Sequence, residues 1–271
     1  MTSMDLFGLA AGGLLSGILA GFLGIGGGTI LVPILVALGY IPVQAVATSS
    51  WAIVITSLSG SWQNWRMGYL DLSRVMFLGI PALITAQLGV LVAGALPGKI
   101  LLIAFGIFLM INVFLVEVRK QIVLRAKRLE GLEEGDRPLP EVEKAPTWSP
   151  VTSRVITGGL AGFMAGIFGI GGGVIMVPLQ ILLLKEPIKL AIQTSLGVIV
   201  MTALSSTGGH AVQGNVLWLP GLILGLGGLL GVQVSTRILP KLPEQVVSLL
   251  FRSMLFLLAL YIFWQAANPQ T

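Results

Sequence analysis

The stretch GFLGIGGGTILVP at residues 21–33 returns as GIFGIGGGVIMVP at residues 166–178, with nine of 13 positions identical at an offset of 145. After one inserted residue, the similarity continues along both halves at an offset of 146. The matched residues there are Ala45 and Ala191, Thr48 and Thr194, Ser49 and Ser195, Ser59 and Ser205, Gly68 and Gly214, Gln87 and Gln233, and Leu96-Pro97 and Leu242-Pro243. Self-similarity at a nearly fixed offset over both halves indicates an internal duplication.

The chain has the composition of an integral membrane protein. Of its 271 residues, 55% are hydrophobic and 10% are charged, whereas an average soluble domain carries about 25% charged residues. Three long runs contain no charged side chain: Leu6–Trp65, Val155–Leu184 and Leu190–Thr236. A water-soluble core does not require uncharged runs of this length, so we expect an all-α polytopic membrane protein in a lipid bilayer.

Charged residues divide the chain into two repeats and a linker. Fifteen of the 27 charges lie between Glu117 and Arg154, and the later part of this region adds four prolines, a composition typical of linkers. We expect residues 1–118 to form the first transmembrane repeat, residues 119–153 a charged cytoplasmic linker, and residues 154–271 the second repeat. About ten membrane segments are predicted: Leu6–Leu23, Gly28–Gly39, Val43–Trp65, Arg74–Leu96, Lys99–Val118, Arg154–Phe168, Gly173–Leu184, Ile188–Val212, Leu217–Leu239 and Glu244–Trp264.

The second segment of each repeat is too short to cross a bilayer alone. Gly28–Gly39 and Gly173–Leu184 are roughly 18 Å long as helices, against a hydrocarbon core of ~30 Å. If each segment returns to the side from which the preceding segment entered, the repeats are inverted, and 14 of the 16 Lys and Arg residues fall on one side. If the two segments form one broken crossing instead, the repeats are parallel and four basic loop residues fall outside. The positive-inside rule favours inverted repeats with half-helices broken at the glycine-rich motifs.

The residue types present exclude several functions. The chain has no cysteine and one histidine, so it has no disulfide, thiolate nucleophile, Cys-based metal site or multi-histidine metal centre. Because no nucleophile–base pair or metal cluster is visible, we expect neither an enzyme nor a bound cofactor. The net charge of +5 reflects basic residues that collect in cytoplasmic loops, so we expect no nucleic-acid partner. The sequence leaves the oligomeric state open.

The glycine triplets mark the candidate binding site. They are Gly26, Gly27 and Gly28 in the first repeat, and Gly171, Gly172 and Gly173 in the second. Consecutive glycines make a helix easy to break, and the amides and positive dipole end of the helix that follows suit an anion. Close helix packing without a ligand is the alternative. On the anion interpretation, alanine at Gly27 or Gly172 should weaken substrate binding and leave thermal stability almost unchanged.

Uncharged polar side chains recur beside the glycine motifs. Thr48 and Ser49 match Thr194 and Ser195, and two further matched pairs are Ser59 with Ser205 and Gln87 with Gln233. Hydroxyls and amides can replace the water around an oxyanion, so all these residues are candidate substrate ligands. For the hydroxyls, bonding to their own helix is the alternative. For the glutamines, the alternative is hydrogen bonding between helices.

Titratable groups are nearly absent from the predicted segments. No Asp or Glu lies deep in any of them, so the carboxylate relay of many proton-driven carriers is missing. His210 is the one side chain that titrates near neutrality, and in the repeat it matches Asn64. It is a candidate substrate ligand, and both a hydrogen-bonding role and a proton-switch role remain open.

Two copies of a GxxGxGGGxxxxP-like block, each followed by a Thr-Ser pair, cover both halves of the chain. This doubled block resembles the sulfite exporter TauE/SafE family of membrane transporters. The resemblance implies transport of sulfur-containing oxyanions such as sulfite, thiosulfate or organosulfonates, often as export across a bacterial inner membrane. The family-like positions are Gly24, Gly26, Gly27, Gly28, Pro33, Thr48 and Ser49, with Gly169, Gly171, Gly172, Gly173, Pro178, Thr194 and Ser195.

Together, the residues and the resemblance predict a secondary transporter that exports small sulfur-containing oxyanions across the inner membrane. The anion would be held at the repeat interface by helix N-termini and by Ser and Thr hydroxyls, and access would alternate between the two sides. Two alternatives remain. One is a transporter or channel for another small solute, and the other is a membrane scaffold that transports nothing.

Overall fold

The computed structural model describes residues 3–130 and 150–267, and every regular element within them is helical. The elements are α1 (Ser3–Leu23), α2 (Gly28–Ala37), α3 (Pro42–Arg66), α4 (Leu72–Ala95), α5 (Gly98–Glu130), α6 (Pro150–Phe168), α7 (Gly173–Leu183), α8 (Ile188–Val212), α9 (Trp218–Ile238), the short 3₁₀ helix η1 (Leu239–Lys241) and α10 (Glu244–Ala267). Within these residues, five helices are long and apolar enough to cross a membrane: α1, α4, α6, α8 and α9. The predicted all-α polytopic membrane fold is confirmed.

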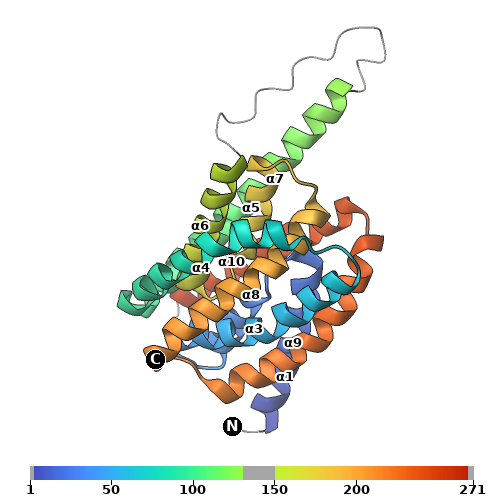
Figure 1. Cartoon of the computed structure of the whole chain (residues 1–271). Coiled ribbons are helices and arrows are strands. Elements are labelled where there is room, and N and C mark those ends of the chain that lie inside the picture. The colour runs from blue at the N-terminus through green and yellow to red at the C-terminus, as the bar shows by residue number, and fades with distance from the viewer. Residues whose placement is uncertain (1–2, 131–149, 268–271) are drawn as a thin grey trace.

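Most of the predicted linker lies outside the described residues. Helix α5 continues to Glu130, and α6 begins at Pro150. Figure 1 shows the C-terminal part of α5 projecting from the upper end of the helical body. The cytoplasmic placement of the linker stays a prediction.

Both glycine motifs break a helix. Helix α1 ends at Leu23 and α6 ends at Phe168, and after each break a short helix begins, α2 with 10 residues and α7 with 11. The residue before each short helix has a left-handed backbone, with φ of 84° at Gly27 and 82° at Gly172. Only glycine adopts this conformation at low cost. The predicted half-helices broken at glycine-rich motifs are confirmed.

The two repeats are inverted relative to each other. Helices α3 and α8 are equivalent in the duplication, and they lie side by side in the middle of the molecule (Figure 1). Ser50 Oγ lies 3.1 Å from Ser206 Oγ, whereas a Cβ atom placed on Gly60 would lie 3.4 Å from Leu196 Cδ1. Along this contact the residue number rises from Ser50 to Gly60 in α3, while it falls from Ser206 to Leu196 in α8. Equivalent helices that run antiparallel require inverted repeats, so this part of the prediction is also confirmed.

The repeats are interleaved through glycine-rich helix contacts. Helix α1 packs along α9, and the equivalent helix α6 packs along α4. A Cβ atom on Gly13 would lie 3.0 Å from Leu224 Cα, and one on Gly158 would lie 2.9 Å from the carbonyl carbon of Leu78. Small residues let the two backbones approach this closely, as is usual between membrane helices. Each repeat thus buries its first helix against the fourth helix of the other repeat.

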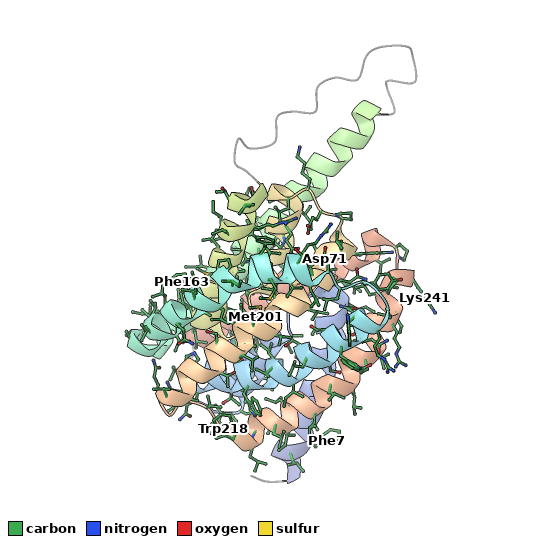
Figure 2. All side chains as sticks on the ribbon, viewed as in Figure 1. Phe7, Asp71, Phe163, Met201, Trp218 and Lys241 are labelled. Carbon is green, nitrogen blue, oxygen red and sulfur yellow. The ribbon has the colours of Figure 1, made fainter. Side chains whose placement is uncertain are left out.

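Three loops with basic residues gather at one end of the molecule. Arg74, at the start of α4, forms an ion pair with Glu186 in the α7–α8 loop. Lys189, at the start of α8, donates a hydrogen bond to the carbonyl of Pro240 in η1. Phe7 and Trp218 both lie towards the opposite, lower end of the molecule (Figure 2). The structure thus brings together the basic loop residues that the positive-inside rule assigns to one side.

Candidate functional site

The two glycine breaks meet where the repeats cross. A Cβ atom on Gly28 would lie 2.6 Å from Ile170 Cα, and one on Gly173 would lie 2.8 Å from Ile25 Cα. The break of one repeat therefore packs directly against the break of the other. All residues of both breaks are buried. The N-termini of α2 and α7 consequently lie beside each other, on the pseudo-two-fold axis that relates the repeats.

Two isoleucines flank this crossing. A Cβ atom on Gly26 would lie 3.1 Å from Ile199 Cγ2 and 3.2 Å from Ile53 Cγ2. The same two side chains lie next to Gly171, at 2.8 Å and 3.3 Å from a Cβ atom placed there. Because Ile53 is in α3 and Ile199 is in α8, each central helix contributes one apolar side chain. In this conformation the crossing is closed by protein atoms.

Side-chain hydroxyls donate hydrogen bonds to four carbonyl oxygens of the breaks. Ser49 Oγ shares its hydrogen between Gly169 O at 2.6 Å and Val46 O of its own helix at 2.9 Å. In the matching contact, Ser195 Oγ lies 2.8 Å from both Gly24 O and Ile192 O. Each serine therefore reaches from the central helix of its own repeat to the break of the other repeat. Two more carbonyls are bonded in the same way, Gly27 O by Ser16 Oγ at 3.1 Å and Gly171 O by Thr202 Oγ1 at 2.9 Å.

The amides at the starts of α2 and α7 remain unoccupied. The first amides of an α-helix have no partner within the helix. Among the residues that the structure describes, those of Gly28 and Thr29 have no acceptor, and neither do those of Gly173 and Val174. Hydroxyls bond four carbonyls of the breaks, whereas those of Ile25, Gly26 and Ile170 have no hydrogen bond among the described residues. The amides at the two helix starts are the unused donors of the crossing. Donors at the positive ends of two helix dipoles favour an anion.

The threonines beside the predicted serines have different surroundings. Thr48 Oγ1 accepts a hydrogen bond from the amide of Leu217 at 3.1 Å. Its match, Thr194, is fully buried, and its hydroxyl has no partner among the described residues. Thr194 therefore keeps an unused donor in the interior of the protein.

The matched glutamines and serines bond to each other across the repeats. Gln87 Nε2 donates to the carbonyl and hydroxyl oxygens of Ser205 at 2.7 and 2.8 Å. Gln233 Nε2 donates to the same two atoms of Ser59 at 3.2 and 2.8 Å. These reciprocal bonds fasten α4 to α8 and α9 to α3, so the structure accounts for all four residues by hydrogen bonding between helices. A substrate contact for them stays a prediction.

His210 contacts the last turn of α6, just before the second glycine break. It follows Ile199 by eleven positions in α8, which corresponds to about 16 Å along a helix. Its side chain is fully buried, and Nε2 lies 3.3 Å from the carbonyl oxygen of Gly166. Gly166 is three residues before Gly169, whose carbonyl Ser49 bonds, and among the described residues no hydrogen bond joins His210 to Ser49 or Ser195.

The structure corrects one expectation about the glycine triplets. A Cβ atom on Gly27 would run into the hydroxyl of Ser16, and one on Gly172 would lie 2.5 Å from the carbonyl oxygen of Ala161. Both glycines also have the left-handed backbone that alanine adopts at a cost of roughly 1–2 kcal/mol. The expectation that alanine would leave thermal stability almost unchanged is therefore wrong, because protein atoms fill the space beside these glycines.

Sequence reasoning missed two hydroxyls that bond to the breaks. Thr202 has a match in Thr56 at the same offset of 146 as the other repeated residues, so the duplication carried a signal for it. Ser16 has alanine, Ala161, at its matching position, and only the fold brings it to Gly27.

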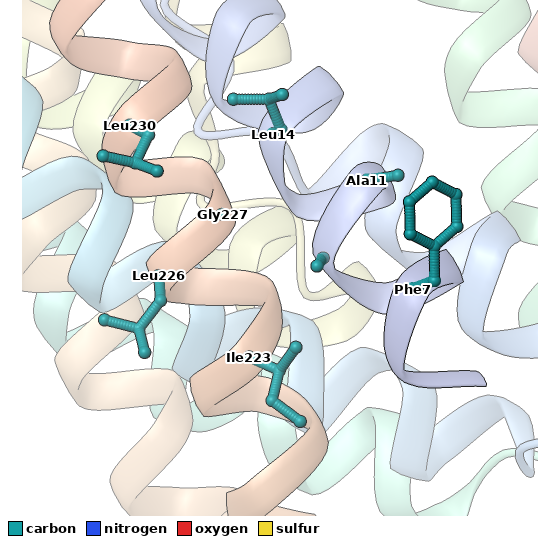
Figure 3. Close-up of a pocket in the computed structure, with 8 residues that line it drawn as sticks. Phe7, Ala11, Leu14, Ile223, Leu226, Gly227 and Leu230 are labelled. Atoms are coloured by element: carbon teal, nitrogen blue, oxygen red, sulfur yellow. The ribbon is translucent and has the colours of Figure 1, made fainter. Parts of the chain in front are cut away.

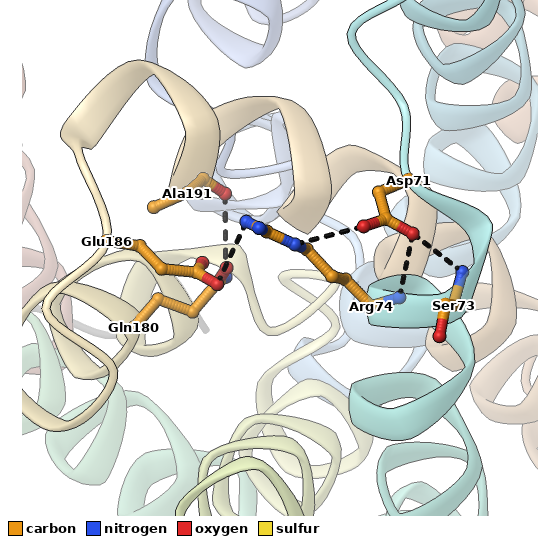
Figure 4. A network of polar contacts seen from close by, with 6 residues as sticks. All are labelled: Asp71, Ser73, Arg74, Gln180, Glu186 and Ala191. Carbon is orange, nitrogen blue, oxygen red and sulfur yellow. Dashed lines mark hydrogen bonds and ion pairs between the residues drawn. The ribbon is translucent and has the colours of Figure 1, made fainter. Parts of the chain in front are cut away.

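An ion pair joins the repeats at the end that carries the basic loops (Figure 4). Arg74 Nη1 lies 3.2 Å from Glu186 Oε1, and Arg74 Nε lies 3.0 Å from Asp71 Oδ2. The other repeat carries no charged residue at the places that match Arg74 and Glu186. The ion pair is therefore not repeated by the duplication, and it belongs to the end of the molecule that carries the basic loops.

The protonation of Glu186 should make stability depend on pH. Burial raises the pKa of Glu186 above its usual value, and the nearby Arg74 and Arg154 oppose this only in part. A carboxyl group with a raised folded-state pKa binds its proton more tightly when folded, so its contribution to stability is lost as pH rises through that pKa. We expect the melting temperature in detergent to fall more steeply for the wild type than for Glu186→Gln as pH rises above the ordinary glutamate range. Parallel curves for the two proteins would contradict this assignment.

A groove on the surface of α1 and α9 has a different character (Figure 3). Apolar side chains and one glycine line it: Phe7, Ala10, Ala11, Leu14, Ile223, Leu226, Gly227 and Leu230. Because no side chain there can donate a hydrogen bond, the groove does not suit an anion.

Comparisons with known proteins agree with the membrane fold. A family model described as "Sulfite exporter TauE/SafE" matches residues 9–262. The probable membrane transporter protein YunE of Bacillus subtilis is 26% identical over 93% of this chain and 95% of its own length. A probable membrane transporter protein of Methanocaldococcus jannaschii is 27% identical over 84% of this chain and 86% of its own length. One from Haemophilus influenzae is 34% identical, over 39% of this chain and 42% of its own length.

Proposed function

The chain belongs to the sulfite exporter TauE/SafE family of membrane transporters, and from this premise we propose that it exports small sulfur-containing oxyanions as a secondary transporter. The substrate class comprises sulfite, thiosulfate and organosulfonates. The anion binds between the two repeats, at the crossing of the glycine breaks. Its hydrogen-bond donors there are the first amides of α2 and α7.

The distribution of hydrogen bonds at the crossing carries this proposal. Ser49, Ser195, Ser16 and Thr202 bond to carbonyl oxygens of the breaks. A carbonyl oxygen repels an anion, so each of these bonds removes an unfavourable contact. The unoccupied amides of Gly28 and Gly173 remain as donors. An oxyanion with several acceptor oxygens could bind both helix ends together.

The symmetry of the fold supports alternating access. In an inverted-repeat transporter the pseudo-two-fold axis lies in the membrane plane, so a site on the axis is near the bilayer midplane. Ile53 and Ile199 close the crossing in the present conformation. Rocking of one repeat against the other would open the crossing to each side of the membrane in turn. The glycine breaks would lie at the centre of this movement.

Flux measurements in liposomes test the proposed function. Purified protein should carry labelled sulfite, thiosulfate or a small organosulfonate down an imposed gradient, and protein-free liposomes should not. A small organic cation in the same panel controls for leakage, because unoccupied amide donors do not stabilise a positive charge. Movement of the cation, with none of the sulfur oxyanions transported, would refute the proposal.

The orientation in the inner membrane is part of the same proposal. We expect the start of α1 and the α4–α5 loop to face away from the cytoplasm, and the α7–α8 loop to face it. Because the chain has no cysteine, single cysteines at Ser3, Lys99 and Lys185 can be labelled with an impermeant reagent in intact cells. Labelling of Ser3→Cys and Lys99→Cys, but not of Lys185→Cys, is the expected result. Labelling of Lys185→Cys alone would show that the protein has the opposite orientation.

A further inference from the structure

Several polar side chains in α3 and α8 have buried atoms with no hydrogen-bond partner among the described residues, and four of them form two pairs three residues apart. These pairs are Ser61 and Asn64 in α3, and Thr207 and His210 in α8. None is more than 9% exposed. At the offset of 146, Ser61 matches Thr207 and Asn64 matches His210. The same pair of unpaired side chains therefore occurs twice, at equivalent positions of the two repeats.

The two pairs lie on opposite sides of the glycine crossing. Residues three apart in a helix share a face, so each pair presents its side chains in one direction. Helices α3 and α8 run antiparallel, with Ser50 beside Ser206. Asn64 lies about 16 Å along α3 from Ile53, and His210 lies the same distance along α8 from Ile199. One pair is thus towards the end with the basic loops, and the other is towards the opposite end.

Unpaired polar atoms in such surroundings require an explanation. A buried group without a hydrogen bond destabilises a protein because its lost contact with water is not replaced, and nearly all buried polar groups have partners. The side chain of Asn64 uses neither its amide nitrogen nor its oxygen, and the hydroxyls of Ser61 and Thr207 are also unused. Other repeated polar residues, such as Gln87 and Gln233, do find partners in the fold.

We propose that these pairs are two stations that bind the transported anion on either side of the glycine crossing. The inner station is Ser61 with Asn64, and the outer station is Thr207 with His210. Hydroxyl and amide groups supply neutral donors that hold an oxyanion without the strong attraction of a buried cation. The inference rests on the proposed function and extends it, because it assigns a separate binding site to each side of the membrane.

Two variants remove the unpaired groups with little change in shape. Asn64→Leu acts on the inner station and Thr207→Val on the outer one. Each replaces a polar atom that has no partner, so the melting temperature should stay the same or rise. The matched control is Thr236→Val, because the buried Thr236 hydroxyl bonds within its own helix to Val232 O at 2.7 Å.

Sulfite uptake into vesicles of both orientations supplies the test. We expect Asn64→Leu to raise the half-saturating concentration about tenfold from the cytoplasmic face, as for one lost hydrogen bond, with little change from the outer face. Thr207→Val should show the reverse, and Thr236→Val should match the wild type.

Three outcomes would overturn the stations. If a variant has a lower melting temperature but a normal half-saturating concentration for sulfite, its side chain has a structural role. If a variant changes the half-saturating concentration equally from both faces, the two pairs are not separate stations. Unchanged stability and transport in both variants would also refute them while leaving the proposed function intact. A wild-type protein that carries no sulfur oxyanion would refute both proposals together.

Discussion

Alanine in place of Gly28 or Gly173 is expected to stop transport and to lower the stability of the protein. A Cβ atom on Gly28 would lie 2.6 Å from Ile170 Cα and 2.7 Å from Ile53 Cδ1, and one on Gly173 would lie 2.8 Å from Ile25 Cα. Because the contacts at 2.6 and 2.8 Å are with backbone, the two breaks must move apart. Overpacking of this kind costs about 1–3 kcal/mol, and it displaces the amides proposed to bind the anion.

Melting temperature in detergent and sulfite flux in liposomes measure the two effects. Gly208→Ala is the matched control, since a Cβ atom there meets nothing within 4 Å and alanine favours a helix. We expect wild-type flux and equal or higher stability for the control. Gly28→Ala protein with the melting temperature and flux of the wild type would show that the breaks do not pack as described.

The second large effect is expected from removing Ser49 and Ser195 hydroxyls together. The double variant Ser49→Ala, Ser195→Ala leaves the carbonyl oxygens of Gly169 and Gly24 without these bonds. Each buried carbonyl left without a bond lowers the stability of the protein by about 1–3 kcal/mol. Its partly negative oxygen also repels the anion. We expect the affinity for sulfite to fall at least about tenfold, which corresponds to ~1.4 kcal/mol.

Substrate-induced thermal stabilisation measures this affinity. Thr56→Val serves as the control, because the Thr56 hydroxyl bonds to Ala52 O within its own helix at 3.1 Å. It should retain the thermal shift of the wild type. If the double variant binds sulfite normally, the serines have no part in preparing an anion site.

The duplication made much of the fold predictable. Three successive glycines before a proline-containing short helix identified both breaks. The basic loops indicated inversion, and the antiparallel contacts of Ser50 with Ser206 and of Gly60 with Leu196 bear it out. These features follow from local residue types and from a repeat period that the sequence displays directly. They do not depend on knowing which helices touch.

Other parts of the site were not predictable, because they depend on contacts between the repeats. The packing of α1 on α9 carries Gly21 to Ser235, a contact that no sequence spacing defines. Ser49 was recognisable as a polar residue near a break, but its bond goes to Gly169 in the other repeat. The pairing of Arg74 with Glu186 likewise joins residues 112 positions apart.

A structure determined in lipid with saturating thiosulfate would show where the anion binds. We expect anion density on the axis between the repeats, within hydrogen-bonding distance of the amides at the starts of α2 and α7. The flanking isoleucines Ile53 and Ile199 should then be further apart than in the closed crossing. Density that contacts none of the amides of Gly28, Thr29, Gly173 and Val174 would contradict the account.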